Sequence, residues 1–159
     1  MDPRPPAAKA PFRRRFFYWL LNFYPPYAGA GIGTRASADL RRFEVTMKAR
    51  PWNRNVFGTH FGGSLYSMCD PFFVLILAEQ LGRGYIVWDK SAKIRFLRPG
   101  RGTVKAVFEL SAEEIARVAA EVERNGKAEP SYTAEVRNAE GEVVAQVEKL
   151  LYVKKKAQR

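Results

Sequence analysis

The sequence has very little of the chemistry that disulfides, metal sites and imidazole-based catalysis require. It contains one cysteine, Cys69, and one histidine, His60, in 159 residues. A single cysteine excludes an internal disulfide framework and a zinc site built from several cysteines. A single histidine excludes any mechanism or metal site that needs two from one chain. The two counts therefore disfavour a metal site built from thiolate and imidazole ligands.

Long hydrophobic runs are also missing. Residues 16–21, Phe-Phe-Tyr-Trp-Leu-Leu, follow three arginines, which is the order of an export signal. Asn22 interrupts this run and Pro25-Pro26 ends it, far short of the ~20 apolar residues that span a bilayer. We expect a short amphipathic helix packed on the domain, with contact to a membrane surface as the alternative. The glycine-containing segment 29–33 is expected to be a flexible connection.

Positive charge is concentrated at the two ends of the sequence. The formal net charge is +11, yet five of the 27 basic residues lie in residues 1–15 and four in residues 154–159. The body between them is close to charge balance, unlike a domain whose face follows a nucleic-acid backbone, so we predict no nucleic-acid partner. We divide the chain into an N-terminal basic, aromatic helix and connection (1–37), one folded domain (38–154) and a basic tail (155–159).

Hydrophobic periodicity predicts an α+β domain. Apolar and polar residues alternate as in half-buried antiparallel strands. These segments are 40–48, 85–98, 103–110, 132–137 and 142–153. Residues 63–81 are apolar on nearly all sides and predict a buried helix. Ser111 and Glu114 form a capping box that opens a second, amphipathic helix ending near Gly126. We expect a long central helix wrapped by a curved antiparallel sheet, with an extra N-terminal helix.

The residues that could carry chemistry lie on the predicted central helix. Ser64, Ser67 and Asp70 recur every three residues and form a polar stripe along it. Pro71 cannot donate the backbone hydrogen bond to the carbonyl of Ser67, so we expect a kink beside Asp70. A buried carboxylate is costly unless it has a partner or a task. Asp70 is therefore either a catalytic residue or a structural one bonded to neighbouring backbone.

Two glycines precede this stripe. Gly62 and Gly63 lie in the first turn of the predicted helix, where another molecule can approach the free N–H groups and the positive end of the dipole. Such donors suit a developing oxyanion; the alternative is that the glycines only turn the chain. Serine hydrolase chemistry is disfavoured, because segment 62–66 departs from the Gly-x-Ser-x-Gly elbow at its last position. Cys69 is interpreted as a small buried thiol.

The segment from Asn55 to Asp70 resembles the active-site segment of hotdog-fold acyl-CoA thioesterases of the phenylacetyl-CoA type. Their pattern is His-Gly-Gly followed, seven residues after the second glycine, by an aspartate, and Gly63 and Asp70 stand at that interval. Residues 93–100 resemble the long central strand and turn of the same fold. The agreement is closer still with a further branch of that superfamily, which has the same aromatic N-terminal helix and Thr-His-Phe-Gly-Gly loop. The resemblance covers about residues 13–154.

This resemblance implies the hotdog fold and a set of site residues. Carried over, the backbone N–H of Gly63 polarises the thioester carbonyl, and Asp70 activates or orients the attacking water. The expected substrate contacts, some of them basic residues for the phosphates of coenzyme A, are Asn55, His60, Gly62, Ser67, Arg95 and Arg101. One departure is that Phe61 stands between the histidine and the glycines in this chain.

Three functions are compatible with these features. The first is acyl-CoA thioester hydrolysis in the cytoplasm, which is expected to need no metal and no other cofactor. The resemblance implies a homodimer or homotetramer, because hotdog subunits pair through edge strands. In such a dimer we expect Asp70 of one subunit near residues 55–62 of the other. The second is a non-catalytic acyl-CoA- or lipid-binding protein that uses the same groove. The third, suggested by the basic ends, is a protein associated with a membrane or with nucleic acid.

Overall fold

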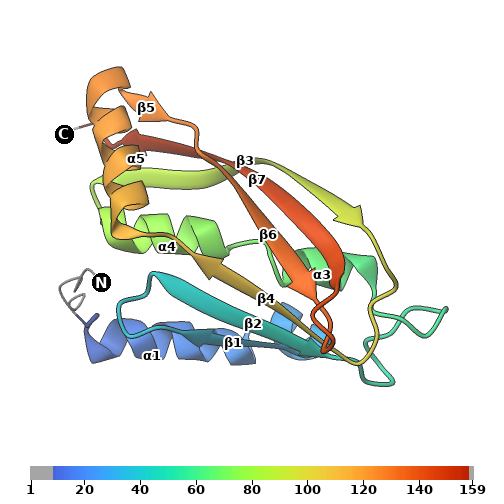
Figure 1. Ribbon diagram of the computed structural model, residues 1–159. Helices are drawn as coiled ribbons and strands as arrows, with labels where there is room; N and C mark the ends of the chain where they lie inside the picture. The colour runs from blue at the N-terminus through green and yellow to red at the C-terminus, as the bar shows by residue number, and fades with distance from the viewer. Residues whose placement is uncertain (1–8, 158–159) are drawn as a thin grey trace, which may run out of the picture.

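The computed structural model describes residues 9–157, and its main element is a curved antiparallel sheet of seven strands within that range (Figure 1). The strands are β1 (Ile32–Ala36), β2 (Arg42–Lys48), β3 (Tyr85–Phe96), β4 (Thr103–Glu109), β5 (Lys127–Ala128), β6 (Ser131–Arg137) and β7 (Val143–Lys155). Their order is β1-β2-β4-β6-β7-β3, and β5 pairs with β7. The two edge strands of the sheet are therefore β1 and β3. This is the α+β architecture that the sequence predicts.

The central helix is divided into two segments, α3 (Gly62–Ser67) and α4 (Phe72–Leu81). Figure 1 shows both in green, lying between the β1-β2-β4 part and the β6-β7-β3 part of the curved sheet. The division falls at Pro71, which has no N–H to continue the helix, so the expected kink beside Asp70 is confirmed. The single helix expected over residues 63–81 is corrected to two.

Helix α5 (Ala112–Asn125) follows the predicted capping chemistry. The Ser111 hydroxyl accepts a hydrogen bond from the N–H of Glu114 at 3.1 Å, and Gly126 ends the helix with a left-handed φ of 76°. Val118 and Val122 are the buried side chains of this helix. The predicted helix after Ser111 is therefore confirmed at both ends.

The N-terminal part comprises α1 (Phe12–Leu20), a 3-10 turn η1 (Leu21–Phe23) and α2 (Pro25–Ala30). The segment 29–33, expected to be a flexible connection, is instead the end of α2 and the start of β1. Pairing with β2 holds this strand in the sheet. The Asn22 amide accepts from the Thr34 N–H at 2.7 Å and donates to the Thr34 carbonyl at 3.2 Å, which satisfies two backbone groups of this edge strand.

The core is organised around a chain of aromatic rings. Tyr18 of α1 packs edge-on against Phe43 of β2, with ring centroids 5.3 Å apart. Phe43 contacts Phe72 of α4 at 5.4 Å, and Phe72 stacks on Phe108 of β4 at 4.9 Å. This chain ties the N-terminal helix, the central helix and the sheet together, so α1 is an integral part of the domain.

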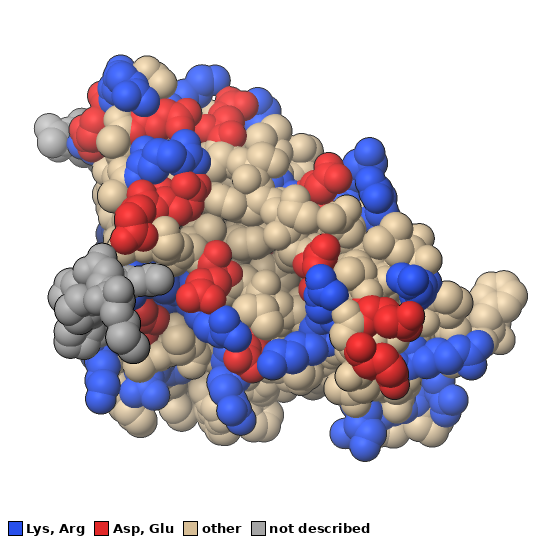
Figure 2. All heavy atoms as spheres, viewed as in Figure 1, with Lys and Arg blue, Asp and Glu red and all other residues tan. Residues whose placement is uncertain are grey.

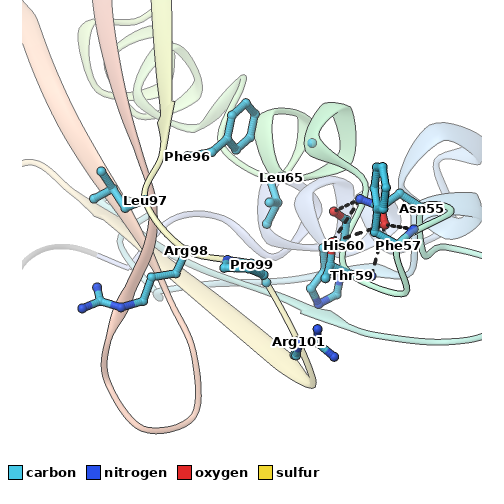
Figure 3. Close-up of a pocket in the computed structure, with 12 residues that line it drawn as sticks. Asn55, Phe57, Thr59, His60, Leu65, Phe96, Leu97, Arg98, Pro99 and Arg101 are labelled. Carbon is cyan, nitrogen blue, oxygen red and sulfur yellow. Dashed lines mark hydrogen bonds between the residues drawn. The ribbon is translucent and has the colours of Figure 1, made fainter.

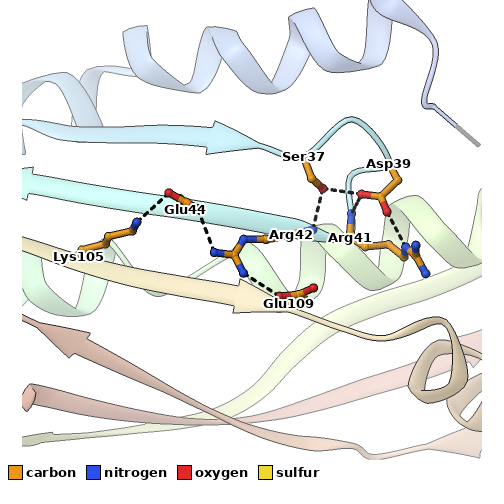
Figure 4. A network of polar contacts seen from close by, with 7 residues as sticks. All are labelled: Ser37, Asp39, Arg41, Arg42, Glu44, Lys105 and Glu109. Carbon is orange, nitrogen blue, oxygen red and sulfur yellow. Dashed lines mark hydrogen bonds and ion pairs between the residues drawn. The ribbon is translucent and has the colours of Figure 1, made fainter. Parts of the chain in front are cut away.

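Charged side chains on β2 and β4 form a network across the strands (Figure 4). Arg42 donates to Glu44 and Glu109, at 2.9 and 2.8 Å, and Lys105 pairs with Glu44 at 2.8 Å. Hydrogen bonds from Lys105 and then Arg42 lower the pKa of Glu44 to about 2. The network is a structural feature of the sheet, separate from the site described next.

Candidate functional site

Asp70 lies at the break between α3 and α4, where its carboxylate meets a buried cation. Its Oδ1 accepts a hydrogen bond from Nζ of Lys149 at 2.9 Å. Lys149 comes from β7, is 1% exposed, and forms a second ion pair at 2.9 Å with Oδ2 of Asp89 on β3. The Asp70 side chain is 47% exposed, which corrects the expectation of a buried carboxylate. Asp70 is therefore held by an ion pair and remains accessible to water.

Tyr66 completes this charged cluster. Nζ of Lys149 lies 3.3 Å from the Tyr66 hydroxyl and 5.3 Å from its ring centroid. Burial lowers the pKa of Lys149, but hydrogen bonds to Asp89 and Asp70 outweigh it and leave that pKa raised. Burial also raises the pKa of Asp89, whose Oδ1 is buried without a hydrogen-bond partner in the described part of the chain. One ammonium group thus serves two carboxylates.

Lys149 is the site residue that the sequence prediction did not include. A signal for it was present, because Val147, Leu151 and Val153 occupy alternate positions that point into the core, and Lys149 has the same parity. A lysine at an inward strand position must be paired, since lysine is almost never fully buried alone. Its partner on the central helix depends on tertiary structure, 79 residues away along the chain.

The start of α3 is the second part of the site. The N–H groups of Gly62 and Gly63 have no hydrogen-bond partner within residues 9–157, as expected for the first turn of a helix. A Cβ added to Gly62 would lie 3.0 Å from the Phe96 ring, and one added to Gly63 would lie 2.5 Å from the Phe61 ring. The two glycines therefore allow aromatic rings to pack directly against the helix start.

A pocket of about 580 Å³ opens beside this helix start, between the loop before α3 and the turn after β3 (Figure 3). Its apolar walls come from Phe57, Leu65, Phe96, Leu97 and Pro99, and its basic residues are Arg98 and Arg101. Gly62 also lines it. The volume is in the range of ~300–1,000 Å³ that small-molecule sites occupy. Mostly apolar walls with a few basic groups suit a molecule that has an apolar part and an anionic part.

Asn55 and His60 both line this pocket, and both also hold its walls in place. The Asn55 side chain accepts from the N–H groups of Phe57 and Thr59, at 3.0 and 3.1 Å, which fixes the loop. Nε2 of His60 lies 3.0 Å from the carbonyl oxygen of Gly102, so this nitrogen carries the proton. His60 is 2% exposed, and burial lowers its pKa. Its neutral form thus ties the loop to the turn after β3.

The other predicted residues are dispersed. Ser67 donates its hydroxyl to the Gly63 carbonyl at 2.9 Å, within α3. Arg101 lines the pocket, whereas Arg95 lies on β3, is exposed and is not among the residues that line it. Cys69 is fully buried, so the interpretation as a small buried thiol is confirmed, and burial raises the pKa of this thiol to about 12.

The pocket and Asp70 are separate within one chain. Asp70 is not among the residues that line the pocket. Gly63 lies in the first turn of α3, whereas Asp70 lies seven residues later, beyond the last residue of α3. The helix start beside the pocket and the Asp70 carboxylate are therefore at opposite ends of α3. Within one chain, Gly62 lines the pocket and Asp70 pairs with Lys149, but the pocket and the Asp70–Lys149 ion pair are two separate sites.

The comparison with known families gives one match that spans most of the chain. The family described as "Domain of unknown function (DUF4442)" matches residues 13–153. The chain belongs to the DUF4442 family. No curated protein matches the sequence. The family description assigns no activity, so the relation of this DUF4442 chain to other proteins depends on its fold.

Solved structures identify that fold as the hotdog fold of thioesterases. A Pseudomonas aeruginosa protein described as a "Probable Thioesterase" aligns with a TM-score of 0.78 at 21% identity, covering 94% of this chain and 99% of that one. A Haemophilus influenzae thioesterase aligns with a TM-score of 0.67 at 18% identity, covering 96% and 98%. The Escherichia coli PaaI protein, from the phenylacetic acid degradation operon, aligns with a TM-score of 0.60 at 21% identity, covering 91% and 95%. The expected fold of this DUF4442 chain is therefore confirmed.

Two further observations on the DUF4442 chain concern membrane-spanning helices and clusters of metal ligands. Among the residues that the structure describes, no helix has both the length and the apolar character to cross a bilayer. Within the same residues, no three or more histidine, cysteine, aspartate or glutamate side chains gather as metal ligands would.

Proposed function

We propose that this protein is an acyl-CoA thioesterase that hydrolyses a thioester to a free acid and coenzyme A. The observation that carries the proposal is the half-exposed Asp70 carboxylate at the break in the central helix of a hotdog fold. The buried Lys149 of β7 holds this carboxylate by an ion pair. The structures with this fold include proteins described as thioesterases, which supports the same reaction class here. The amphipathic character of the pocket supports a substrate with an apolar acyl chain and an anionic carrier.

The proposed reaction uses Asp70 as a general base. A water molecule beside the carboxylate attacks the thioester carbonyl carbon, and its proton passes to Asp70 as the new C–O bond forms. The carbonyl electron pair moves to oxygen, where backbone N–H donors stabilise the oxyanion. When the C–S bond breaks, the proton on Asp70 passes to the leaving sulfur. The products are a carboxylic acid and a thiol, and Asp70 is regenerated as a carboxylate.

The oxyanion donors are proposed to come from a second copy of the chain. The place of Asp70 supports this arrangement, because Asp70 is not among the residues that line the pocket beside the start of α3 in its own chain. The exposed edge strand β3, which pairs only with β7 in the described residues, is the surface through which two copies would extend one sheet. In the dimer, Asp70 of one protomer faces the Asn55–Gly62 loop of its partner.

The basic residues beside the pocket are proposed to bind the phosphates of coenzyme A. Arg98 and Arg101 lie on the turn that lines the pocket. Arginine binds phosphate oxygens through charge-assisted hydrogen bonds, and often in a bidentate geometry. The acyl part then lies against the apolar walls, among them Leu65 and Phe96. Arg95 remains part of the proposed contact set through the partner protomer, because it lies on the edge strand.

A second candidate function is acyl-CoA binding without hydrolysis. It is favoured by one observation: the ion pair with Lys149 gives Asp70 a structural task that requires no chemistry. Release of free thiol from a panel of short, long and aromatic acyl-CoA thioesters distinguishes the two. Hydrolysis with a specific chain preference supports the thioesterase, whereas saturable acyl-CoA binding without thiol release supports the binding protein. Light scattering on the same sample tests the dimer, and an active monomer at micromolar concentration would contradict the shared site.

A further inference from the structure

Helix α1 presents its aromatic face to solvent. Phe12, Phe16, Trp19 and Phe23 recur along one side of α1 and η1 and are 77%, 47%, 52% and 63% exposed. Their rings form a continuous ladder, with centroids 6.1, 5.5 and 4.9 Å apart. We call these four residues the aromatic ladder. A surface helix ordinarily turns such a face toward the core, so the orientation of this one requires an explanation.

The opposite side of α1 fixes this orientation. Tyr18 is buried against Phe43, and its hydroxyl donates to Oε2 of Glu79 on α4 at 3.1 Å. Arg14 forms an ion pair with the same carboxylate. At 100° per residue, Arg14 lies about 170° from the centre of the aromatic ladder, and Tyr18 about 130° from it. The helix is thus anchored through its polar side, and the aromatic ladder points outward as a fixed platform.

Basic residues flank the aromatic ladder on both sides. Arg13 and Arg15 are exposed and project about 80° to either side of its centre. Neither has an ion-pair partner within the described residues 9–157, and the first turn of α1 contains no acidic residue. Figure 2 shows Lys and Arg side chains interspersed with uncharged surface along the lower margin, where Figure 1 places α1.

We propose that α1 is an interfacial helix that binds the surface of a bilayer containing anionic lipids. The aromatic ladder would enter the boundary between headgroups and acyl chains, where Trp and Phe are favoured. Arg13 and Arg15 would stay at headgroup level, because their long side chains extend around an apolar face to reach phosphates. The helix lies on the membrane and does not cross it. This inference rests on α1 alone and does not depend on thioester hydrolysis.

Charge argues for lipid over a second copy of the chain as the occupant. If two copies packed their aromatic ladders together, their unpaired arginines would lie close to one another with no acidic residue of α1 between them. Like charges brought together at an interface oppose association. A bilayer with anionic lipids suits both parts of the helix. Its headgroups supply negative charge for the arginines, and the boundary with the acyl chains accepts the aromatic ladder.

The test uses the full chain and vesicles of phosphatidylcholine with and without phosphatidylglycerol. We expect co-sedimentation with the anionic vesicles that weakens as salt is raised, and little with phosphatidylcholine alone. Trp19→Ser is expected to weaken binding by about tenfold or more. Trp52→Ser is the matched control, because Trp52 is 65% exposed on a loop away from α1, and it is expected to bind as the unchanged protein does.

A second pair of variants tests the charges, and each variant removes two positive charges from the chain. Arg13→Gln with Arg15→Gln is expected to weaken binding and to remove most of its salt dependence. Arg83→Gln with Arg124→Gln, at two exposed positions elsewhere, is expected to change neither. In a chain whose Trp52 and Trp88 are both replaced by Phe, the emission of Trp19 should shift to shorter wavelength when anionic vesicles are added.

Three results would overturn the proposal. They are the absence of vesicle binding at low salt, equal binding by the Trp19→Ser and Trp52→Ser variants, and no shift in Trp19 emission. If Trp19→Ser instead reduces the mass of an oligomer without vesicles, the ladder is a protein interface and the lipid assignment is wrong. Melting temperatures measured for every variant exclude unfolding as the cause of any loss.

Discussion

The ammonium group of Lys149 lies 2.9 Å from the Asp70 carboxylate, which joins the last core strand to the break in the central helix. This contact gives Asp70 a fixed position at the break between α3 and α4. It also makes Asp70, the candidate catalytic residue, one of two carboxylates that compensate the buried charge of Lys149. Each of the first two predictions below separates these two tasks.

Lys149→Met removes the cation and leaves two carboxylates facing each other. We expect the free energy of unfolding to fall by ~2–4 kcal/mol at neutral pH, somewhat less than the ~3–5 kcal/mol for a fully buried pair, because the Asp70 side chain is 47% exposed. The loss should shrink in acid, because burial already raises the pKa of Asp89 and a neutral Asp89 needs no cation. Lys149→Arg, which keeps the charge, should lose less. Urea unfolding at several pH values measures both, and a pH-independent loss would argue against the ion-pair explanation.

Asp70→Asn and Asp89→Asn form a matched pair, since each removes one carboxylate at 2.9 Å from the same lysine. Asp70→Asn is expected to reduce turnover of acyl-CoA by ~10²–10⁴-fold, as for the loss of a general base. Asp89→Asn should reduce turnover far less, with a comparable change in melting temperature. Thiol release and melting curves on the same preparations compare the two. Equal losses of turnover would assign Asp70 a structural role.

Gly62→Ala should narrow the pocket without weakening the fold. The new Cβ would lie 3.0 Å from the Phe96 ring, which is 56% exposed and must shift by a few tenths of an ångström. We expect a higher KM for acyl-CoA and little change in melting temperature. Gly29→Ala, on α2 with no atom within 4 Å, is the control and should leave KM unchanged. An unaffected KM in Gly62→Ala would place the acyl chain elsewhere.

Arg101→Ser tests the phosphate contact. If the pocket binds coenzyme A, this variant should raise KM more than it lowers kcat, and the rise should be smaller at high salt, where the charge is already screened. Arg95→Ser removes the same charge from β3, outside the pocket of its own chain. An effect of Arg95→Ser that appears only in the dimer would indicate a contribution from the partner protomer. Unchanged kinetics in both variants would exclude this part of the surface.

The network on β2 and β4 predicts a pH dependence of stability. Hydrogen bonds from Lys105 and Arg42 lower the pKa of Glu44 from its usual value of 4.5 to about 2 in the folded protein. Stability from this group is therefore complete above about pH 4.5 and is lost as the pH falls toward about 2. Glu44→Gln should lower the melting temperature at pH 6, and the difference from the unchanged protein should disappear near pH 2. A constant difference across this range would contradict the assignment.

Elements with strong local signals could be predicted from the sequence. The alternation in β4 and the capping pair Ser111 and Glu114 determine their own structure within a few residues. Strand β1 could not be found in this way, because it has only five residues and is defined by its pairing with β2. The same holds for the two-residue β5, which is too short to show a period.

The candidate site divides along the same line. Asp70 and the two glycines could be recognised from their spacing on one segment. Lys149 could not be assigned to Asp70, because pairing between β7 and the helix depends on the closed fold. His60 was expected as a substrate contact in a loop, and its hydrogen bond to Gly102 joins two segments that are 42 residues apart. Residues close together in the sequence could be recognised as a site, whereas contacts between distant segments could not be predicted from the sequence.

The pairing of Asp70 with Lys149 also affects how relatives of this protein should be compared. A relative without hydrolytic activity would still need an anion beside the buried lysine, so selection for folding alone would favour keeping this aspartate. Its presence in an aligned sequence is then weak support for activity. A more informative marker is a change at Lys149 alone, because it removes the structural reason for keeping the Asp70 carboxylate. Sequences that have an uncharged residue in place of Lys149 and still keep Asp70 would show that the aspartate is retained for a reason other than this ion pair.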